Sequence, residues 1–251
     1  MAEQPTPKGY LKAFDPLTGE DRWVVEIPHY WNGGVLGTAG GLVFQGDALG
    51  MLTAYDKDTG EALWQFNTYT SMLAPPITYE IDGTQYVSIL TGNGGGDLFS
   101  GEAMDPVAMP ASTTYGNYGR LLVFKLGGTA SLPEPQLRDR TIPEQTLADV
   151  SDEEIARGES LYHDFCGVCH GLIVRSAGAI PDLRQMSEAT HEAFDQIVLN
   201  GLLAANGMAA FNDVLAEEDV ARIHNYVRAR AQQDREYALG NIDAPRLTWF
   251  E

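Results

Sequence analysis

The sequence predicts two kinds of structure in succession, a β-rich N-terminal part and an all-helical C-terminal part. Near the N-terminus a strand–turn–strand motif occurs twice with a period of 41 residues, from Trp23 to Trp64. After residue 150 the apolar residues recur at helical spacing instead. The stretch between the parts has no periodicity and is interrupted by prolines, which is typical of a linker. The expected boundaries are a β domain at 1–126, a linker at 127–150, a helical domain at 151–232 and a C-terminal tail at 233–251.

The repeated motif indicates the kind of β domain. Each copy contains a strand, an Asp-x-x-Thr-Gly turn and a second strand that carries the tryptophan. The glycine of each turn, Gly19 or Gly60, allows a positive φ, and the Asp and Thr side chains can bond nearby amides. A period near 40 residues with short strands is typical of propeller blades. We expect about two blades, with each tryptophan packed across neighbouring blades.

The rest of the β domain contains further strand signals. Residues 75–79 and 85–90 are expected to form a β-hairpin, and residues 121–126 a last strand. The glycine-rich stretch 92–96 has neither a following Lys-Ser/Thr nor a helix, so we interpret it as a loop and not as a phosphate site.

The charge of the chain excludes some classes of partner. It has 16 basic and 35 acidic residues, a formal net charge of −19. This charge disfavours nucleic acid and anionic membranes as partners. The sequence also lacks a run of about 18 apolar residues, so we expect no transmembrane helix.

The chemistry of the helical domain is indicated by residues 166–170, which read Cys-Gly-Val-Cys-His and contain both cysteines of the chain. C-x-x-C-H is the attachment signature of a c-type haem. Cys166 and Cys169 can add to the two vinyl groups of one porphyrin, and His170 is placed to ligate the iron. A zinc site would need further ligands, and a redox dithiol would need a βαβ surround. The sequence therefore predicts a covalent haem c.

Helices are expected on both sides of this motif. Ser151 and Glu154 form the pattern of a capping box at the start of a helix that ends near residue 165. A second long helix is expected at 216–232 and a shorter one at 192–199. We expect Gly158 to let the two long helices cross closely, with Tyr162 and Tyr226 near the contact. Two crossing helices beside C-x-x-C-H are the plan of a small c-type cytochrome.

The iron needs a sixth ligand opposite His170. Met208, in a glycine- and alanine-containing loop, is the first choice, because Met/His ligation raises the reduction potential as an electron acceptor requires. Met186 is the second choice. The histidines at 163, 191 and 224 are interpreted as surface residues. Arg175 and Arg184 are interpreted either as partners of the haem propionates or as ordinary surface arginines.

The combination of these motifs resembles the C-terminal portion of the PQQ-dependent quinohaemoprotein alcohol dehydrogenases. The resemblance rests on the propeller repeats, the Trp-Asn-Gly-Gly run that starts at Trp31, the strand at 41–46 and the C-terminal C-x-x-C-H domain. It implies an eight-bladed-type quinoprotein β-propeller, represented here by about two blades, followed by an all-α cytochrome c domain.

The resemblance also implies a reaction. An alcohol is oxidised at pyrroloquinoline quinone (PQQ), and the haem passes the electrons on to an external carrier such as a small copper protein or a cytochrome. Trp31 and Asn32 match the Trp-Asn pair that lies beside the quinone in this family. Calcium is a further cofactor of the complete enzyme.

This chain departs from the family pattern in several ways. The resemblance places the calcium ligands, the catalytic aspartate and the other blades in a part that this sequence lacks, so we assign no catalytic residue here. Asn93 stands where the family tends to have a tryptophan. We therefore expect the chain to oxidise alcohols only together with the missing N-terminal propeller region or a partner chain that supplies it. The alternative interpretation is a free-standing c-type electron-transfer protein with a β docking module.

The cellular location follows from the haem. In bacteria a c-type haem is attached outside the cytoplasmic membrane, so we expect a periplasmic protein. The N-terminal residues, Met-Ala-Glu-Gln-Pro, contain no apolar region of a signal peptide. The natural start of the protein is therefore expected further upstream.

Overall fold

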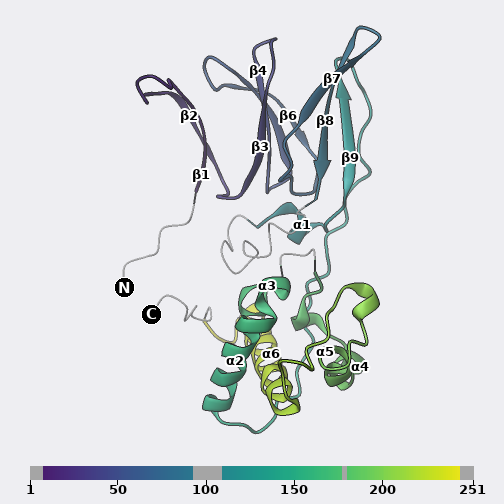
Figure 1. Cartoon of the computed structure of the whole chain (residues 1–251). Coiled ribbons are helices and arrows are strands. Elements are labelled where there is room, and N and C mark those ends of the chain that lie inside the picture. Colours follow the sequence, from purple (N-terminus) through teal and green to yellow (C-terminus); the bar gives the residue numbers. More distant parts are fainter. Residues whose placement is uncertain (1–7, 93–108, 177–179, 244–251) are drawn as a thin grey trace. The chain divides into compact units, whose positions relative to one another are not determined.

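The computed structural model describes residues 8–92, 109–176 and 180–243. Within them the chain forms two compact units, one up to Arg138 and the other from Asp139 onward. Figure 1 shows strands in the first unit and helices in the second. The predicted fold class, β followed by α, is confirmed. Each unit is described by itself.

The first unit, here called the β unit, contains three antiparallel sheets with two, four and three strands. The middle sheet has the order β3-β4-β5-β6, so each strand pairs with its neighbour in sequence, as in a propeller blade. Figure 1 shows the three sheets fanned out side by side. The strands are β1 (Gly9–Phe14), β2 (Asp21–Ile27), β3 (Asn32–Gly37), β4 (Leu42–Asp47), β5 (Met51–Asp56), β6 (Ala62–Asn67), β7 (Ile77–Ile81), β8 (Thr84–Thr91) and β9 (Arg120–Lys125).

The two copies of the repeat form the hairpins β1-β2 and β5-β6. In the second copy Asp56 Oδ1 accepts from the amides of Asp58 and Thr59, both at 2.9 Å. These amide bonds lower the pKa of Asp56. Gly60 completes the turn with φ +77°. The predicted turn chemistry is confirmed.

The tryptophan of the first repeat contacts the turn of the second. Trp23 Nε1 donates to the Lys57 carbonyl at 2.9 Å. A Cβ on Gly60 would lie 2.8 Å from the Trp23 ring, so only glycine leaves room for this approach. The predicted packing of tryptophan across neighbouring repeats is confirmed for Trp23.

Small apolar clusters join the sheets. Leu11, Ile27 and Tyr55 form one buried cluster, and Trp23 packs against it. A second cluster consists of Leu52, Met72 and Ile89. The predicted hairpin is present as β7-β8, and the predicted last strand as β9. The glycine loop, including Asn93, lies largely outside the described residues.

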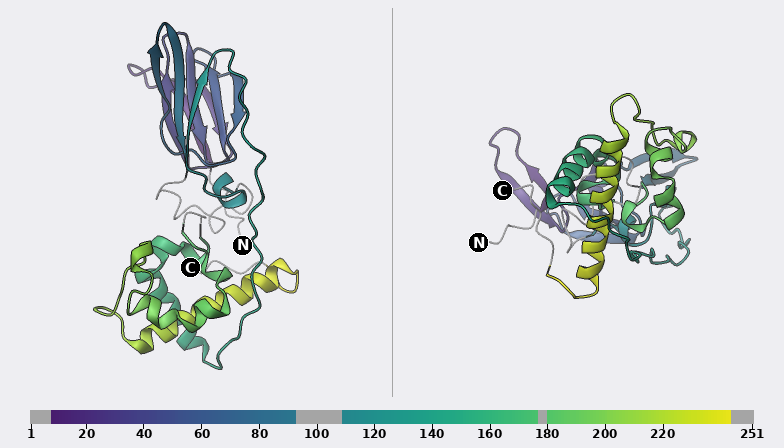
Figure 2. Two further views of the ribbon diagram at one scale, coloured as in Figure 1. Left: turned by 90° about the vertical axis from the view of Figure 1, so that its right-hand side faces the viewer. Right: turned by 90° about the horizontal axis from the view of Figure 1, so that it is seen from below.

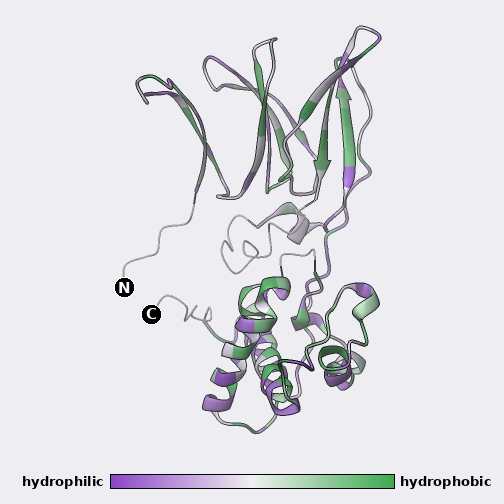
Figure 3. Ribbon diagram, in the orientation of Figure 1, coloured by the Kyte–Doolittle hydropathy of each residue, from purple (hydrophilic) through white to green (hydrophobic). Residues whose placement is uncertain are grey.

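The second unit, here called the helical unit, is built around two crossing helices, α2 and α6, which Figure 2 shows from two further directions. In Figure 3 both helices carry hydrophilic and hydrophobic segments in alternation, as expected when one face is buried. The helices of this unit are α2 (Asp152–Phe165), α3 (Gly167–His170), α4 (Glu188–Glu192), α5 (Phe194–Val198) and α6 (Glu217–Ala238), with 3₁₀ turns at Leu172–Val174, Leu183–Gln185 and Ala204–Asn206.

Gly158 lies where α2 and α6 cross. A Cβ at this position would lie only 2.2 Å from the Arg222 carbonyl oxygen. The rings of Tyr162 and Tyr226 are 5.5 Å apart at the same contact. Both tyrosines belong to the buried core of the unit, together with Val220, Ile223 and Val227 of α6 and others. The predicted close crossing at Gly158 is confirmed.

Some local predictions were wrong. Ser151 accepts from the Glu154 amide at 3.3 Å, as an N-cap should, but the Glu154 carboxylate bonds Arg222 at 2.8 Å and does not return to the cap. A charged partner on the neighbouring helix was therefore preferred to the local amide. The predicted helix at 192–199 is interrupted at Ala193, which separates α4 from α5. The long C-terminal helix continues past residue 232 to Ala238.

Candidate haem and quinone sites

The two cysteines are one helical turn apart. Cys166 ends α2 and begins the short helix α3, and its carbonyl accepts from the Cys169 and His170 amides at 3.1 and 2.9 Å. Cys166 is buried, and burial raises the pKa of its thiol to about 12, whereas Cys169 is exposed. Neither forms a disulfide. The spacing of the two thiols is therefore set by one helical turn.

His170 is buried, with 8% of its surface exposed. Its Nδ1 lies 3.1 Å from the Pro181 carbonyl oxygen. Because a carbonyl can only accept, Nδ1 carries the proton and the lone pair is on Nε2. Burial lowers the pKa of His170, while the Pro181 contact and Asp182 oppose this effect. The imidazole is therefore neutral and in the tautomer that a metal ligand needs.

The turn after the motif is held by a buried tyrosine. Tyr162 is fully buried and its hydroxyl donates to the Gly171 carbonyl at 2.8 Å. Ile173 and Val174 follow with φ of 51° and 66°, values that β-branched residues rarely adopt. Both residues are buried, so the surrounding packing maintains this strained backbone.

The two methionine candidates occupy different positions. Met186 is a buried member of the core of the helical unit. Met208 is half-buried and packs against the same core from the loop that follows Gly207, whose φ is +95°. In that loop the Phe211 ring lies 6.3 Å from the Phe165 ring of α2.

Three histidines predicted to be at the surface are not exposed. His191 is buried and its Nδ1 lies 2.8 Å from Nε2 of His224, which is half-buried and stacks on Phe194 with ring centroids 4.3 Å apart. His163 is half-buried as well. The surface interpretation was wrong because the contacts of His191 and His224 come from separate helices, α4 and α6.

Arg175 and Arg184 are not surface residues either. Arg175 donates through Nε and Nη2 to the two oxygens of Asp234, both at 2.9 Å, and Arg184 Nη1 donates to Oδ2 at 2.8 Å. Burial alone would raise the pKa of Asp234, but the Arg175 hydrogen bond and the neighbouring arginine charges bring it below its ordinary value. The interpretation of both arginines as ordinary surface residues is therefore wrong.

The predicted quinone-side residues lie at the start of β3. Trp31 is 38% exposed, and its backbone amide donates to Nδ1 of His29 at 3.0 Å. Asn32 donates through Nδ2 to the His29 carbonyl at 2.6 Å, while its buried Oδ1 has no hydrogen-bond partner among the described residues. Trp31 is therefore accessible to a ligand, whereas the Asn32 Oδ1 is enclosed by the protein.

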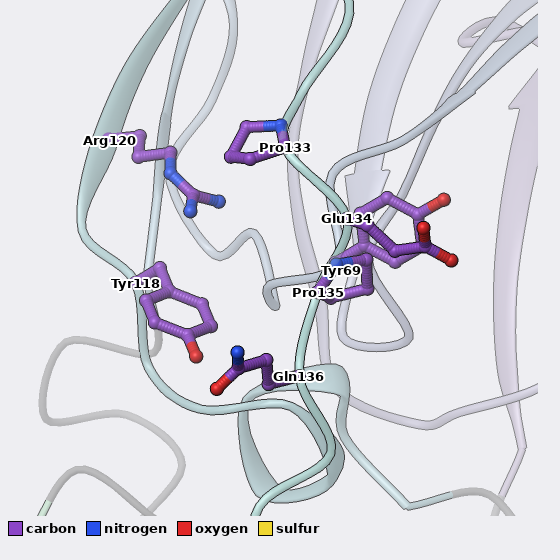
Figure 4. A pocket seen from close by; sticks show the side chains of 7 residues that line it. All are labelled: Tyr69, Tyr118, Arg120, Pro133, Glu134, Pro135 and Gln136. Atoms are coloured by element: carbon purple, nitrogen blue, oxygen red, sulfur yellow. The ribbon is translucent and has the colours of Figure 1, made fainter.

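A concave site of about 190 Å³ lies elsewhere in the β unit. Figure 4 shows Arg120 and Tyr118 on one side of it and residues 133–136 on the other. The Arg120 guanidinium lies 4.8 Å from the centre of the Tyr118 ring. None of the predicted site residues lines this pocket.

The donor set of the helical unit fits a haem better than a multidentate metal ion. In the part of the chain that the structure describes, no group of three or more His, Cys, Asp and Glu side chains could hold a metal. Two cysteines one turn apart and a neutral histidine suit a porphyrin that brings four of the iron ligands itself. Within the same residues, no helix combines the length and the apolar character needed to cross a membrane.

A propeller-type β unit followed by a C-x-x-C-H helical unit defines a multidomain haem protein of the oxidoreductase class. Comparison with known families agrees with this assignment. Residues 25–87 match the model of the β-propeller domain of glucose/ethanol/alcohol dehydrogenases. Residues 153–227 match the model of subunit III of cbb3-type cytochrome c oxidase.

The similarity to individual proteins is more specific than these two domain matches. The chain is 46% identical over 230 residues to quinohemoprotein alcohol dehydrogenase ADH IIB of Pseudomonas putida, covering 90% of this chain and 32% of that protein. The solved structure of ADHIIG from Pseudomonas putida aligns with a TM-score of 0.82 at 37% identity, over 92% of this chain and 32% of the other. The enzyme from Comamonas testosteroni aligns with a TM-score of 0.73 at 32% identity, over the same shares.

The chain belongs to the quinohaemoprotein alcohol dehydrogenase family and matches the C-terminal portion of its members, which combines quinoprotein propeller and cytochrome c. It spans about a third of the length of these relatives. Haem c is accordingly the cofactor of the helical unit, and PQQ and calcium are cofactors of the full-length enzymes.

Sequence reasoning missed some residues that support the site. Pro181 acts through its backbone carbonyl, which no side-chain pattern reveals. Asp234 is distant in sequence from both arginines that it binds. Tyr162 was expected at the helix crossing, but its bond to Gly171 was not.

Proposed function

We propose that this chain is the electron-accepting C-terminal part of a quinohaemoprotein alcohol dehydrogenase. In this proposal, an alcohol is oxidised at PQQ in the complete protein, and electrons leave through the helical unit to an external carrier such as a small copper protein or a cytochrome. When bound, the haem supplies one-electron chemistry. The missing propeller region, or a partner chain that provides it, would supply the catalytic aspartate and the calcium site.

The residues of the helical unit have separate roles in this proposal. Cys166 and Cys169 would form the two thioether bonds, since one helical turn separates them. His170 would ligate the iron through Nε2. Met208 would be the sixth ligand, because it lies at the edge of the core in a loop, whereas Met186 is a core residue. The observation that carries the proposal is the buried His170 directly after the two cysteines, with its Nδ1 3.1 Å from the Pro181 carbonyl oxygen.

The residues of the β unit would contact the quinone. The partly exposed Trp31 would pack against the planar ring, and Asn32 would lie beside the quinone, as the family resemblance implies. Both residues are at the start of β3 and are held there by His29. Hydrogen bonds to His29 thus hold both residues in position within the chain itself.

The haem assignment is tested by producing the chain with the c-type haem maturation machinery. A pyridine haemochrome spectrum and haem that stays on the denatured chain are expected for the unmodified sequence. The double variant Cys166→Ala/Cys169→Ala should lose covalent haem completely. Met208→Ala should lose the long-wavelength absorption band of Met–iron ligation, whereas Met186→Leu should keep it. The opposite result would move the ligand to Met186.

The enzyme assignment needs a second experiment. The chain alone, supplied with PQQ and calcium, should not turn over alcohols. Co-production with a propeller region that provides the remaining blades should restore PQQ-dependent dye reduction with a primary alcohol. If haem binds but no propeller partner restores turnover, the free-standing electron carrier becomes the better interpretation.

The proposed location is the periplasm, because covalent haem attachment takes place outside the bacterial cytoplasmic membrane. Osmotic-shock fractionation of the native organism tests this. Haem-staining material of this sequence in the shock fluid is expected, and its restriction to the cytosol would contradict the proposal.

A further inference from the structure

One carboxylate in the helical unit receives three guanidinium groups. Asp234 on α6 binds Arg175 and Arg184, and Arg230 Nη2 donates to its Oδ1 as well. All four side chains are buried, with exposed fractions between 3% and 11%. A buried network of this kind is strongly destabilised when one partner is removed, since the remaining charges stay uncompensated.

The network reaches the segment that faces His170. Asp182 caps the 3₁₀ turn Leu183–Gln185, and its Oδ1 accepts from the Arg184 amide and from Arg184 Nε, both at 3.0 Å. This turn directly follows Pro181, whose carbonyl accepts the Nδ1 proton of His170. Asp182 therefore makes the turn rigid internally, while the bond from Arg184 to Asp234 fixes the whole turn to α6.

We propose that Asp234 is a positioning residue for the haem-ligating histidine: through Arg184 it holds the turn whose Pro181 carbonyl orients the His170 ring. This inference rests on the proposed role of His170 as an iron ligand. It assigns Asp234 no contact with the iron or with substrate.

The chemical consequence concerns the strength of the ligand. A hydrogen bond from Nδ1 fixes the ring orientation of a ligating histidine and raises its basicity. If Asp234 is neutralised, Arg184 loses its anchor on α6 and the Pro181 carbonyl can move away from His170. A less basic imidazole stabilises the oxidised iron less, so the reduction potential of the haem should rise.

The test uses the haem-loaded full chain and the variant Asp234→Asn. Two quantities are measured: the solvent exchange rate of the His170 Nδ1 proton by NMR, and the reduction potential. We expect faster exchange of this proton than in the wild-type chain, because its hydrogen bond to Pro181 is weakened, and a higher reduction potential. The variant Arg184→Lys, which keeps the net charge but loses the forked geometry, should change both quantities in the same direction. Arg184→Lys also tests the proposal if the Asp234→Asn variant does not fold.

A matched control separates positioning from simple charge removal. Glu236→Gln removes one negative charge from the same helix, but Glu236 bonds Gln232, Asn241 and Arg235 and is outside the network. It should leave the exchange rate unchanged. Equal shifts in Glu236→Gln and Asp234→Asn, or wild-type exchange in both Asp234→Asn and Arg184→Lys, would overturn the inference. A wild-type chain without covalent haem would instead refute the proposed function.

Discussion

The two units of this protein complete their candidate sites in different ways. In the helical unit, one core and one salt-bridge network surround the predicted haem residues, and every contact to His170 and Asp234 described above comes from the same unit. The β unit has two small clusters of three buried residues each. Its strand β7 is exposed at every residue, and its sheets have two, four and three strands in the described part of the chain.

This difference indicates which contacts stabilise each candidate site. Helices satisfy their backbone groups internally, so a few crossing contacts are enough to fix a ligand set. Strands need neighbours for both their hydrogen bonds and their apolar faces. We therefore expect the stability of the helical unit to depend mainly on contacts within it. The stability of the β unit should depend more on the strands that pair with its sheet edges. Four predictions test this comparison.

The largest effect is expected at the crossing of α2 and α6. Gly158→Ala would place a methyl group 2.2 Å from the Arg222 carbonyl, and neither backbone can yield without separating the helices. The helical unit should lose about 3 kcal/mol of stability, at the upper end of the usual cost of overpacking. Urea unfolding followed by helical circular dichroism measures this. Ser160→Ala, on an exposed position of the same helix, is the control and should change little. Equal stability in both variants would contradict the prediction.

The second prediction concerns the stability of the helical unit at acidic pH. Burial and the Arg228 charge lower the pKa of His191, while Glu188 opposes this effect. Burial, Arg228 and His191 together lower the pKa of His224 to about 4 against the opposing effect of Glu188. Because the unfolded histidines bind protons near pH 6.5, the unfolded state takes up more protons than the folded state below that pH. Stability is therefore complete above about pH 6.5 and falls towards pH 4.

The loss should be on the order of 2 kcal/mol, since the half-buried His224 is partly screened by solvent. Thermal unfolding of the helical unit between pH 4 and 8 measures it. His224→Gln should flatten the acid limb of the curve. An unchanged slope in this variant would show that other groups cause the acid sensitivity.

A smaller effect is expected in the β unit. Trp23→Phe removes the hydrogen bond to the Lys57 carbonyl and part of the ring surface over Gly60. The cost should be about 1–2 kcal/mol and confined to the two repeats. Hydrogen exchange of peptides from β1 to β6 measures it, and the helical unit should keep its protection. Trp64→Phe, which leaves the Trp23 contact intact, is the comparison variant. Increased exchange in the helical peptides would contradict the prediction that the effect is confined to the two repeats.

The smallest change in stability is expected at β7. Ile77 is 58% exposed and lies on an edge strand. Ile77→Lys should alter the free energy of unfolding by no more than about 0.5 kcal/mol but reduce self-association of the β unit through this edge. Sedimentation velocity measures the association. Glu80→Gln changes the net charge by the same amount without removing an apolar side chain. If it reduces association equally, charge and not the apolar edge is responsible.

Much of the fold could be predicted because its signals are local. The period from Trp23 to Trp64 indicated stacked β repeats, and the structure shows the contact that this period implies. The helical pattern around Gly158 indicated a close crossing that the structure confirms. Cys166 to His170 indicated the cofactor in five consecutive residues.

The errors concern contacts between residues far apart in sequence. His191 and His224 looked like solvent-facing positions because each was judged on its own helix, although they face each other. Glu154 was assigned to its own cap, but Arg222 of the opposite helix offers a full charge. Asp234 gave no signal at all, because a single acidic residue near the end of a polar helix is ordinary until its partners are known.

The contact between Trp23 and Gly60 has a consequence for how neighbouring repeats can change. The tryptophan belongs to one repeat and the glycine that receives it to the next, so the contact depends on one residue from each repeat. Loss of either residue weakens a contact that the two repeats share. Selection on one repeat is therefore also selection on the adjoining one.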